Sequence, residues 1–328
     1  MSFRLKIEIQ IDAHPRTGDF NIMPRYCVIA NPTSGRGTGG RMIPVIERLM
    51  KDRGLDFDLI RTERPWHAAE LAYQAVVKRY DFVVAAGGDG TVNEVVNGLV
   101  RARQENLDGT ALSVLTVGRG NDFAYSLRIP HELKLAVETM AAGHKKSIDI
   151  GRLRGGLFPQ GRCFCNGVGI GFDAVVGFES VKLDPLSDFP SYLVAALKTI
   201  MLYFHAPKVQ IELKDETIVQ PSLMVSIMNG RRMGGGFHMA PVSKPDDGLF
   251  DICIAGEVSR LEILGMIPWF LKGTQAGHPA IQFRKSRHVK VTALNDSLPA
   301  HADGETMALT ASCLEMDVIP GAIELMVP

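Results

Sequence analysis

Two short loops in the second half of the chain carry carboxylates in positions where they can move a proton or hold a cation. The stretch His301-Ala302-Asp303-Gly304-Glu305 places two carboxylates on either side of a glycine. One carboxylate of such a loop can take a proton from a hydroxyl group while the other holds the geometry or a metal. An ordinary hairpin turn would explain this loop, taken alone, equally well.

The second acidic loop is Lys244-Pro245-Asp246-Asp247-Gly248-Leu249. Adjacent carboxylates in a turn bounded by proline and glycine, with free backbone carbonyls, suit a hard cation such as Mg²⁺. A β-turn opened by Pro-Asp and closed by glycine is at least as good an explanation.

Glycine-rich turns in the first half are suited to phosphate. Gly87-Gly88-Asp89-Gly90-Thr91 follows the apolar run Phe82-Val83-Val84 and precedes valines at helical spacing, so the chain reads strand, glycine turn, helix. The glycines let the backbone approach a ligand, and the free amides of a helix start, with Thr91 as its expected N-cap, favour an anion. The alternative is an ordinary turn that happens to be rich in glycine.

Three further turns, 31–40, 62–65 and 116–124, also follow predicted strands. Strands and helices alternate through this half, which predicts a doubly wound α/β domain with a mostly parallel sheet. Ligands on such sheets lie beyond the carboxyl ends of the strands, where we expect these turns to face one crevice.

The predicted elements divide the chain after a polar extension, residues 1–24. The first domain, residues 25–147, takes strands 25–30, 57–61, 82–84 and 111–115 and helices 42–52 and 67–79. The second, residues 148–315, is β-rich, a sheet or sandwich with strands 148–154, 161–168, 207–214, 221–229, 249–255, 287–294 and 314–318. We expect the last residues, 316–328, to pack back on the first domain.

Two apolar helices are expected in the second domain, residues 191–205 and 258–274. They cover the sheet, or part of their surface lines a cleft for an acyl chain or touches a bilayer. The glycine-rich loop 229–236 either contacts substrate, with its arginines on phosphate, or is a flexible connector.

Bulk composition excludes some classes of protein. The 328 residues are 46% hydrophobic and 22% charged, with 36 basic and 36 acidic residues, so no global field attracts nucleic acid. The odd number of cysteines, 5, and the lack of a signal peptide predict a cytoplasmic protein with reduced thiols. No apolar run reaches the ~18 residues of a membrane span, so contact with lipid would be peripheral. Walker, Rossmann, protein-kinase, zincin and serine-hydrolase motifs are absent from the sequence.

Taken in order, the motifs resemble the diacylglycerol kinase catalytic-domain family, the soluble bacterial lipid kinases related to sphingosine and ceramide kinases. The matching blocks, which span about residues 25–328, are Asn31–Gly35, Gly87–Thr91 with Asn93-Glu94, Gly118–Phe123, Asn166–Gly171, Pro245–Leu249 and Asp303–Glu305. The Gly-Gly-Asp-Gly-Thr block is shared with NAD kinases, whereas the ordered set is specific.

The resemblance implies an ATP-binding α/β domain joined to a β-rich lipid domain, with the active site between them. It implies catalytic roles for Glu305 as proton acceptor, Asp303, and Asp89 as organiser of metal and phosphate. It places Mg²⁺ on the Asp247 side chain and the carbonyls of Lys244 and Leu249. The residues expected to hold ATP are Asn31, Ser34, Gly35, Thr62, Gly87, Gly88, Asp89, Gly90, Thr91 and Asn93.

Arg119 departs from the family, whose members usually carry threonine there; the arginine is expected to pair with a phosphate. The predicted reaction is ATP- and Mg²⁺-dependent phosphorylation of a lipid hydroxyl, of diacylglycerol or a related lipid alcohol, at a membrane surface. Two alternatives stay open: a kinase of a soluble metabolite such as NAD, and a non-catalytic lipid- or nucleotide-binding module. Whether the chain forms a homodimer is also open.

Overall fold

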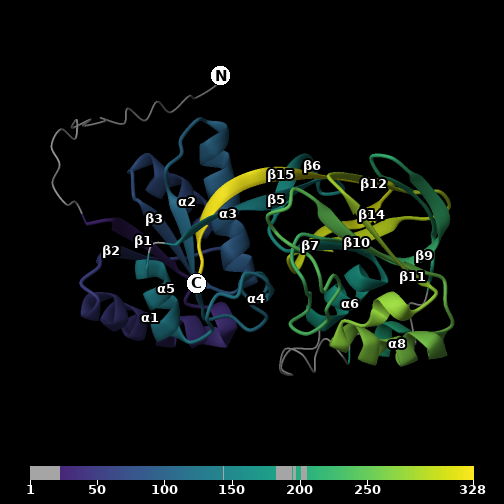
Figure 1. The fold of residues 1–328 in the computed structure, drawn as a ribbon, viewed down its shortest axis with the longest axis horizontal. Coiled ribbons are helices and arrows are strands. Elements are labelled where there is room, and N and C mark those ends of the chain that lie inside the picture. Colours follow the sequence, from purple (N-terminus) through teal and green to yellow (C-terminus); the bar gives the residue numbers. More distant parts are fainter. Residues whose placement is uncertain (1–22, 143, 182–193, 195–196, 201–204) are drawn as a thin grey trace, which may run out of the picture.

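The computed structural model describes residues 23–142, 144–181, 194, 197–200 and 205–328. An N-terminal α/β lobe and a C-terminal β-rich lobe lie side by side (Figure 1). β5 (Lys145–Gly155) and β15 (Cys313–Met326) form a long antiparallel pair that bridges the lobes. The predicted fold class, a doubly wound domain followed by a β-rich sandwich, is confirmed. The predicted domain limits stay predictions, because β5 and β15 each run across one of them.

The N-terminal lobe is built on a parallel sheet with strand order β4-β3-β1-β2. Its strands are β1 (Arg25–Ala30), β2 (Asp56–Arg61), β3 (Phe82–Gly87) and β4 (Ala111–Thr116), and its helices are α1 (Ser34–Asp52), α2 (His67–Val77), α3 (Asp89–Gln104), α4 (Asp122–Ser126) and α5 (Leu133–Ala142). α2 and α3 bury apolar side chains on one face of the sheet, and α1 and α5 do so on the other. β3 and β4 are buried along their whole length, as expected of strands covered on both faces. The end of β15 joins this sheet where Leu325 pairs with Leu112.

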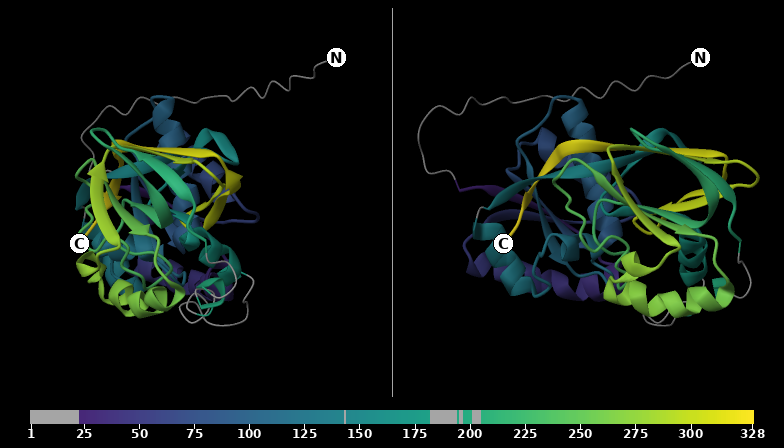
Figure 2. Two further views of the ribbon diagram at one scale, coloured as in Figure 1. Left: turned by 90° about the vertical axis from the view of Figure 1, so that its right-hand side faces the viewer. Right: turned by 45° about the vertical axis from the view of Figure 1, so that its right-hand side comes forward.

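The C-terminal lobe is antiparallel. Its further strands are β6 (Phe158–Phe164), β7 (Gly167–Gly171), β8 (Lys208–Glu212), β9 (Thr217–Met228), β10 (Phe250–Gly256), β11 (Ile281–Ser286), β12 (His288–Ala293), β13 (Leu298–Ala302) and β14 (Glu305–Ala311), and its helices are α6 (Phe172–Val181), α8 (Arg260–Lys272) and the 3₁₀ turn η1 (Gln275–Gly277). One layer contains β6, β5, β15, β12 and β8, and the other contains β14, β13, β7, β9, β10 and β11. A core that includes Phe164, Ile227 and Phe250 contains side chains from both layers. α6 and α8 lie along one side of this lobe (Figures 1 and 2).

Several predicted boundaries are wrong for identifiable reasons. Gly88, not Thr91, is the N-cap of α3, and Thr91 lies in the first turn of that helix. The helix predicted from residue 42 begins earlier. The bounds of α1 start at Ser34, because they include a left-handed turn at 35–37 that leads directly into the regular helix. The strand predicted over 161–168 is two strands, since residues 165–166 leave the ladder. A bend at Arg287 likewise separates β11 from β12.

Strands β11, β13 and β14 and helices α4, α5 and α6 were not expected from the sequence. The helix predicted over 191–205 and the extension 1–24 lie mostly outside the described residues.

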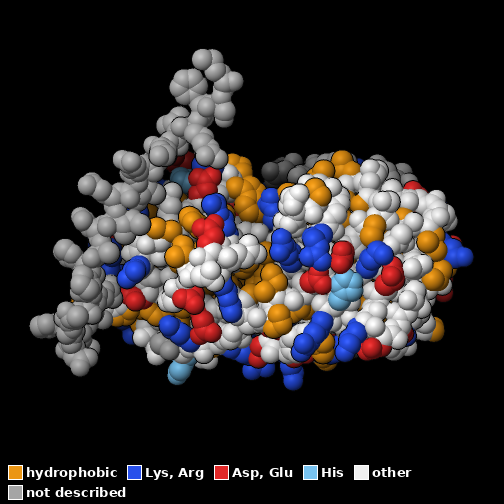
Figure 3. Space-filling view, turned by 90° about the horizontal axis from the view of Figure 1, so that it is seen from above, with side chains coloured by type: hydrophobic (Ala, Val, Ile, Leu, Met, Phe, Trp, Pro, Cys, Tyr) orange, Lys and Arg blue, Asp and Glu red, His pale blue; other side chains and the backbone are white. Residues whose placement is uncertain are grey.

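The surface and the cysteines agree with the composition. Acidic and basic side chains are interspersed over the upper face of the C-terminal lobe (Figure 3). All cysteines are free thiols, as predicted, and four of them are buried: Cys27, Cys163, Cys165 and Cys253. In the described part of the chain, no helix has both the length and the apolar character needed to cross a bilayer.

Candidate active site

The turns after β1, β3 and β4 meet at the carboxyl edge of the parallel sheet. Asn31 N donates to the Ala86 carbonyl at 3.0 Å, and Val117 N donates to the Gly87 carbonyl at 3.1 Å. A Cβ on Gly118 would lie 2.2 Å from the Cα of Gly88. Only glycine lets these two turns touch, so the predicted convergence rests on close backbone contact.

The loop after β1 makes a left-handed turn. Residues 35–37 all have left-handed dihedrals, with φ of 55°, 56° and 84°. Gly37 N donates to the Thr33 carbonyl at 3.2 Å, and the expected contact of this turn with phosphate stays a prediction. The Asn31 amide donates to Thr91 Oγ1 at 3.0 Å, which ties this loop to the glycine turn of α3. Ser34 Oγ lies 3.5 Å from the position that a Gly88 Cβ would take.

The other predicted ATP residues lie around the same edge. Thr62 N extends the β2 ladder by donating to the Ala30 carbonyl at 2.9 Å, and its side chain is half-buried. Arg119 is exposed in the turn after β4. The structure contains no nucleotide, so the contacts of both residues with ATP stay predictions.

Asp89 opens α3 beside a second carboxylate, Asp122. Its Oδ1 accepts a hydrogen bond from Phe123 N at 3.0 Å, which fixes the turn before α4. A Cβ on Gly120 would lie 2.9 Å from Asp89 Oδ2 and 3.7 Å from Asp122 Oδ2. Burial first, and then the charge of Asp122, raise the pKa of Asp89 to about 7. A divalent cation would relieve the repulsion of the two carboxylates, but it would have to share Asp122 with Arg232, whose Nε lies 2.7 Å from Asp122 Oδ1.

Asp303 is saturated with hydrogen bonds from both lobes. Its Oδ2 accepts from Asn93 Nδ2 at 2.7 Å and from Cys165 N at 2.6 Å. Its Oδ1 accepts from the backbone amides of Asn166 and Gly167, each at 3.0 Å. A carboxylate with four donors is an anchor, so Asp303 holds the geometry of this turn, and the proton transfer expected of Glu305 stays a prediction.

The hairpin turn that carries Asp303 is of the tight two-residue kind. Asp303 has φ of 48° and Gly304 has φ of 84°, and both left-handed residues match a type I′ turn between β13 and β14. The hairpin explanation of this loop is therefore confirmed, and the chemical role of its carboxylates stays a prediction.

Helix α3 is fastened to the C-terminal lobe by two asparagines one turn apart. Asn93 Nδ2 and Asn97 Nδ2 each donate to the Cys163 carbonyl at 3.1 Å. Asn97 Oδ1 accepts from Cys163 N at the same distance. Asn93 is buried and its amide bonds protein groups, so its contact with ATP stays a prediction while its role in joining the lobes is visible.

Glu305, the first residue of β14, faces a guanidinium held between aromatic rings. Arg162 Nη1 lies 3.6 Å from Glu305 Oε2. The Arg162 guanidinium stacks 3.5 Å from the Trp66 ring of the N-terminal lobe and 4.1 Å from the Phe158 ring. Burial raises the pKa of Glu305; Arg162 opposes this, and Glu94 and Asp303 add to it. A carboxylate with a raised pKa is suited to accept a proton.

Arg162 and Trp66 were missed because neither lies in a recognisable motif. Arg162 is a lone basic residue in a strand, and Trp66 lies in a polar turn. Only the fold brings them together.

The glycine-rich loop at 229–236 meets the turn before α4. Arg232 Nε lies 2.7 Å from Asp122 Oδ1, and Gly235 N donates to Asp122 Oδ2 at 3.0 Å. Arg232 Nη2 also donates to the Gly120 carbonyl at 2.9 Å. The loop therefore closes a second contact between the lobes, and Arg232 is engaged with a carboxylate in this structure.

The predicted magnesium turn is clamped to β5. Pro245 O accepts from Asp149 N at 2.7 Å, and Gly248 N donates to Asp149 Oδ2 at 2.6 Å. Lys285 Nζ lies 3.0 Å from Asp247 Oδ2 and 3.2 Å from Asp251 Oδ2. The oxygen donors fit a hard cation and already attract one, the lysine ammonium, which Mg²⁺ would have to displace from Asp247.

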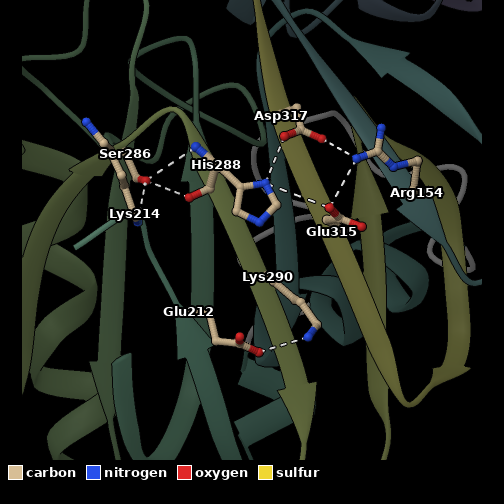
Figure 4. A network of polar contacts seen from close by, with 8 residues as sticks. All are labelled: Arg154, Glu212, Lys214, Ser286, His288, Lys290, Glu315 and Asp317. Atoms are coloured by element: carbon tan, nitrogen blue, oxygen red, sulfur yellow. Dashed lines mark hydrogen bonds and ion pairs between the residues drawn. The ribbon is translucent and has the colours of Figure 1, made fainter. Parts of the chain in front are cut away.

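A second ionic cluster on β12, β15 and β5 has the residue types of a metal site (Figure 4). His288, Glu315 and Asp317 are the one set of three potential ligands found among the described residues. His288 Nδ1 lies 2.8 Å from Asp317 Oδ1, while Arg154 Nη2 bonds Glu315 at 3.1 Å and Asp317 at 2.5 Å. Because the arginine already neutralises both carboxylates, this cluster is an ion-pair network that ties the strands together.

Comparison with known proteins identifies the family. The model of the diacylglycerol kinase catalytic domain matches residues 25–153, and that of the YegS C-terminal NAD kinase beta sandwich-like domain matches residues 166–327. A diacylglycerol kinase of Bacillus subtilis (strain 168) is 30% identical over 294 residues, which cover 86% of this chain and 90% of that protein. The chain belongs to the diacylglycerol kinase catalytic-domain family. A diacylglycerol kinase of Staphylococcus saprophyticus is 27% identical over 282 residues, covering 86% of this chain and 88% of that protein.

Solved structures share the fold of this diacylglycerol kinase family member. A putative diacylglycerol kinase from Bacillus anthracis str. Sterne superposes with a TM-score of 0.74 at 20% identity, covering 94% of this chain and 99% of that one. Yeast NADH kinase complexed with NADH reaches 0.50 at 10% identity, covering 94% and 84%. Family membership supports a kinase, a phosphotransferase that uses a nucleotide.

Proposed function

We propose that this chain transfers the γ-phosphoryl group of ATP to the hydroxyl of a lipid alcohol, with diacylglycerol as the first candidate. The observation that carries the proposal is the 2.7 Å hydrogen bond between Asn93 and Asp303. It holds the helix that starts at the glycine turn against the hairpin that carries Glu305. In this proposal the phosphate-binding amides and the proton acceptor share one interlobe site.

Each part of the site has a role in phosphoryl transfer, which depends on positioning and charge neutralisation more than on covalent chemistry. The backbone amides of the left-handed turn at 35–37 and of the start of α3 bind the phosphates. Glu305 takes the proton of the attacking hydroxyl, and Arg162 keeps its carboxylate in place. Asp303 fixes the hairpin turn and so holds the Glu305 side chain in position.

Magnesium has two candidate sites in this proposal. Asp89 and Asp122 would hold an ion near the phosphates, where it would neutralise their charge. Asp247, with the carbonyls of Lys244 and Leu249, would hold an ion against β5. That turn reaches the hairpin through Asn229, whose amide donates at 2.9 Å both to the Asp149 carbonyl and to the Cys165 carbonyl.

The C-terminal lobe offers a place for an acyl chain. An apolar pocket that opens to solvent lies between α6, α8 and the second β layer. Its lining residues are Phe172, Asp173, Val176, Ile200, Leu223, Met224, Met233, Phe237, Met239, Ala255, Ile263, Met266, Ile267 and Phe270. Methionine-rich walls adapt to flexible chains. Asp173, the one ionisable side chain of this lining, gives the pocket a polar end, where Ser226 Oγ donates to it at 3.3 Å.

The test is transfer of radiolabelled phosphate from ATP to a panel of diacylglycerol, a sphingoid base, ceramide and NAD, with Mg²⁺ and with chelator. We expect a labelled lipid, dependence on Mg²⁺, and a 10²- to 10⁴-fold loss of kcat in Glu305→Gln. Glu324→Gln makes the same chemical change at an exposed site on β15 and should leave kcat unchanged. Labelled NAD with unlabelled lipid would move the assignment to a soluble-metabolite kinase. ATP binding without turnover on any member of the panel would leave a binding module.

A further inference from the structure

Helix α8 exposes apolar side chains on its outer face. Leu261 is 80% exposed, Leu264 37% and Trp269 38%. The helix is capped at both ends, by a capping box at Ser259 and by the left-handed Gly273. No charged residue occurs from Ile263 to Leu271. A surface helix normally carries charged side chains on the side that faces water, so this apolar face is suited to contact with an apolar surface.

The inner face of the same helix lines the apolar pocket. Ile263, Met266 and Phe270 are buried there, at 6%, 5% and 8% exposure. One helix thus contacts the pocket with one side and solvent with the other. The pocket and the exposed apolar face are therefore the two sides of a single helix.

We propose that the outer face of α8 docks on the surface of a lipid bilayer and presents the pocket to membrane-borne lipid alcohol. The inference rests on the proposed lipid kinase function and names the element that meets the membrane. Leu261 and Leu264 enter the acyl boundary, while Trp269 lies at the headgroup level, where indole rings are favoured. Val242, 71% exposed beside the end of α8, widens the apolar face.

Charge favours a bilayer of anionic lipid. Arg260 and Lys272 stand at the two ends of the helix, on either side of its uncharged stretch, and the one acidic residue of the helix, Glu262, accepts a hydrogen bond from Ser259 N at 2.7 Å in the capping box. Basic residues beside an inserted apolar face attract anionic headgroups, each contributing about tenfold or less to binding. The geometry fits a membrane better than a second copy of the chain. A helix of 13 residues is about 20 Å long, and one side of it offers far less than the ~800 Å² per partner of a stable interface.

The experiment measures vesicle binding and catalysis separately. Full-length protein is sedimented with vesicles of phosphatidylcholine and phosphatidylglycerol, with and without diacylglycerol. The variant Leu261→Glu/Leu264→Glu is compared with Leu309→Glu, which makes the same change at a 63% exposed leucine on β14. Kinase activity is assayed on vesicle-borne diacylglycerol and on a short-chain diacylglycerol dispersed as monomers.

We expect the double variant to partition onto vesicles about 100-fold more weakly, roughly tenfold for each leucine, while Leu309→Glu partitions like the parent. Activity on vesicles should fall with binding, and activity on the monomeric substrate should persist, which also shows that the variant is folded. With Trp66→Phe, Trp269 is the only tryptophan, and its emission should shift to the blue when vesicles are added.

Parent-like vesicle binding by the double variant overturns the proposal. So does a parent chain that is dimeric and becomes monomeric in the double variant, because the face then meets a second copy. If no lipid is phosphorylated by the parent while its vesicle binding still depends on α8, the kinase assignment fails and the docking surface stands.

Discussion

Asp89→Asn should stabilise the metal-free protein at alkaline pH. The native pKa of Asp89, about 7, lies above its ordinary value of 3.8 because burial and Asp122 oppose its charge. Between these two values the native state binds more protons than the unfolded state, so the stability of the parent falls as pH rises. Asparagine keeps an oxygen for Phe123 N and removes the charge.

The size follows from the shift. About three pKa units at 1.36 kcal/mol each give roughly 4 kcal/mol when Asp89 is fully ionised. Its side chain keeps partial contact with solvent, so we take about half, ~2 kcal/mol. For a chain of this size that raises Tm by about 4 °C at pH 8 and by almost nothing at pH 4.

The assay is thermal unfolding in chelator from pH 4 to pH 8, with Asp108→Asn on the exposed α3–β4 loop as the matched control. Adding Mg²⁺ should stabilise the parent more than the variant, because only the parent keeps both carboxylates of the Asp89–Asp122 site, while the proposed site at Asp247 is the same in both. A variant that is less stable than the parent at pH 8, or a difference that is the same at every pH, would refute the electrostatic reasoning.

Three further outcomes are expected. Gly118→Ala should cost about 3 kcal/mol in chemical unfolding, because its Cβ would meet backbone at 2.2 Å, whereas Gly90→Ala, with open space around it, should cost little. Asp303→Asn should cost about 3 kcal/mol, since one oxygen that accepts two N–H groups becomes a donor; parent-like stability would contradict its anchoring role. Arg162→Gln should move the acidic limb of the pH–rate profile to higher pH, since it removes the cation that lowers the pKa of Glu305, and an unmoved limb would separate Glu305 from the chemistry.

The parallel half of the fold could be predicted because its signals are local. Continuous apolar strands such as 82–84 and glycine turns at their carboxyl ends define both the sheet and the edge where ligands bind. The Asp303-Gly304 turn was readable for the same reason, since few residue pairs suit two left-handed positions.

The missed elements have ambiguous local sequences. β13 contains Pro299 and alternates poorly, and β14 is rich in alanine, so neither looks like a strand until it pairs. β7, Gly167–Gly171, depends on glycine at 169 because a Cβ there would lie 2.4 Å from Asp173 Oδ2. These strands are determined by long-range packing, which overrides local preference.

The position of Glu305 relative to the phosphate-binding turns follows from one helix. Asp89, Asn93 and Asn97 are spaced four apart on α3, so they lie on one face at intervals of about 6 Å along the axis. The first faces the phosphate edge, the second bonds Asp303, and the third bonds the edge of β6. α3 thereby holds the hairpin about one helical turn from the glycine turn. β5 and β15 also run unbroken between the lobes. Changing the separation of the two turns would therefore require breaking the hydrogen bonds of Asn93 and Asn97 on α3. These hydrogen bonds are the natural place to look for control of the proposed reaction.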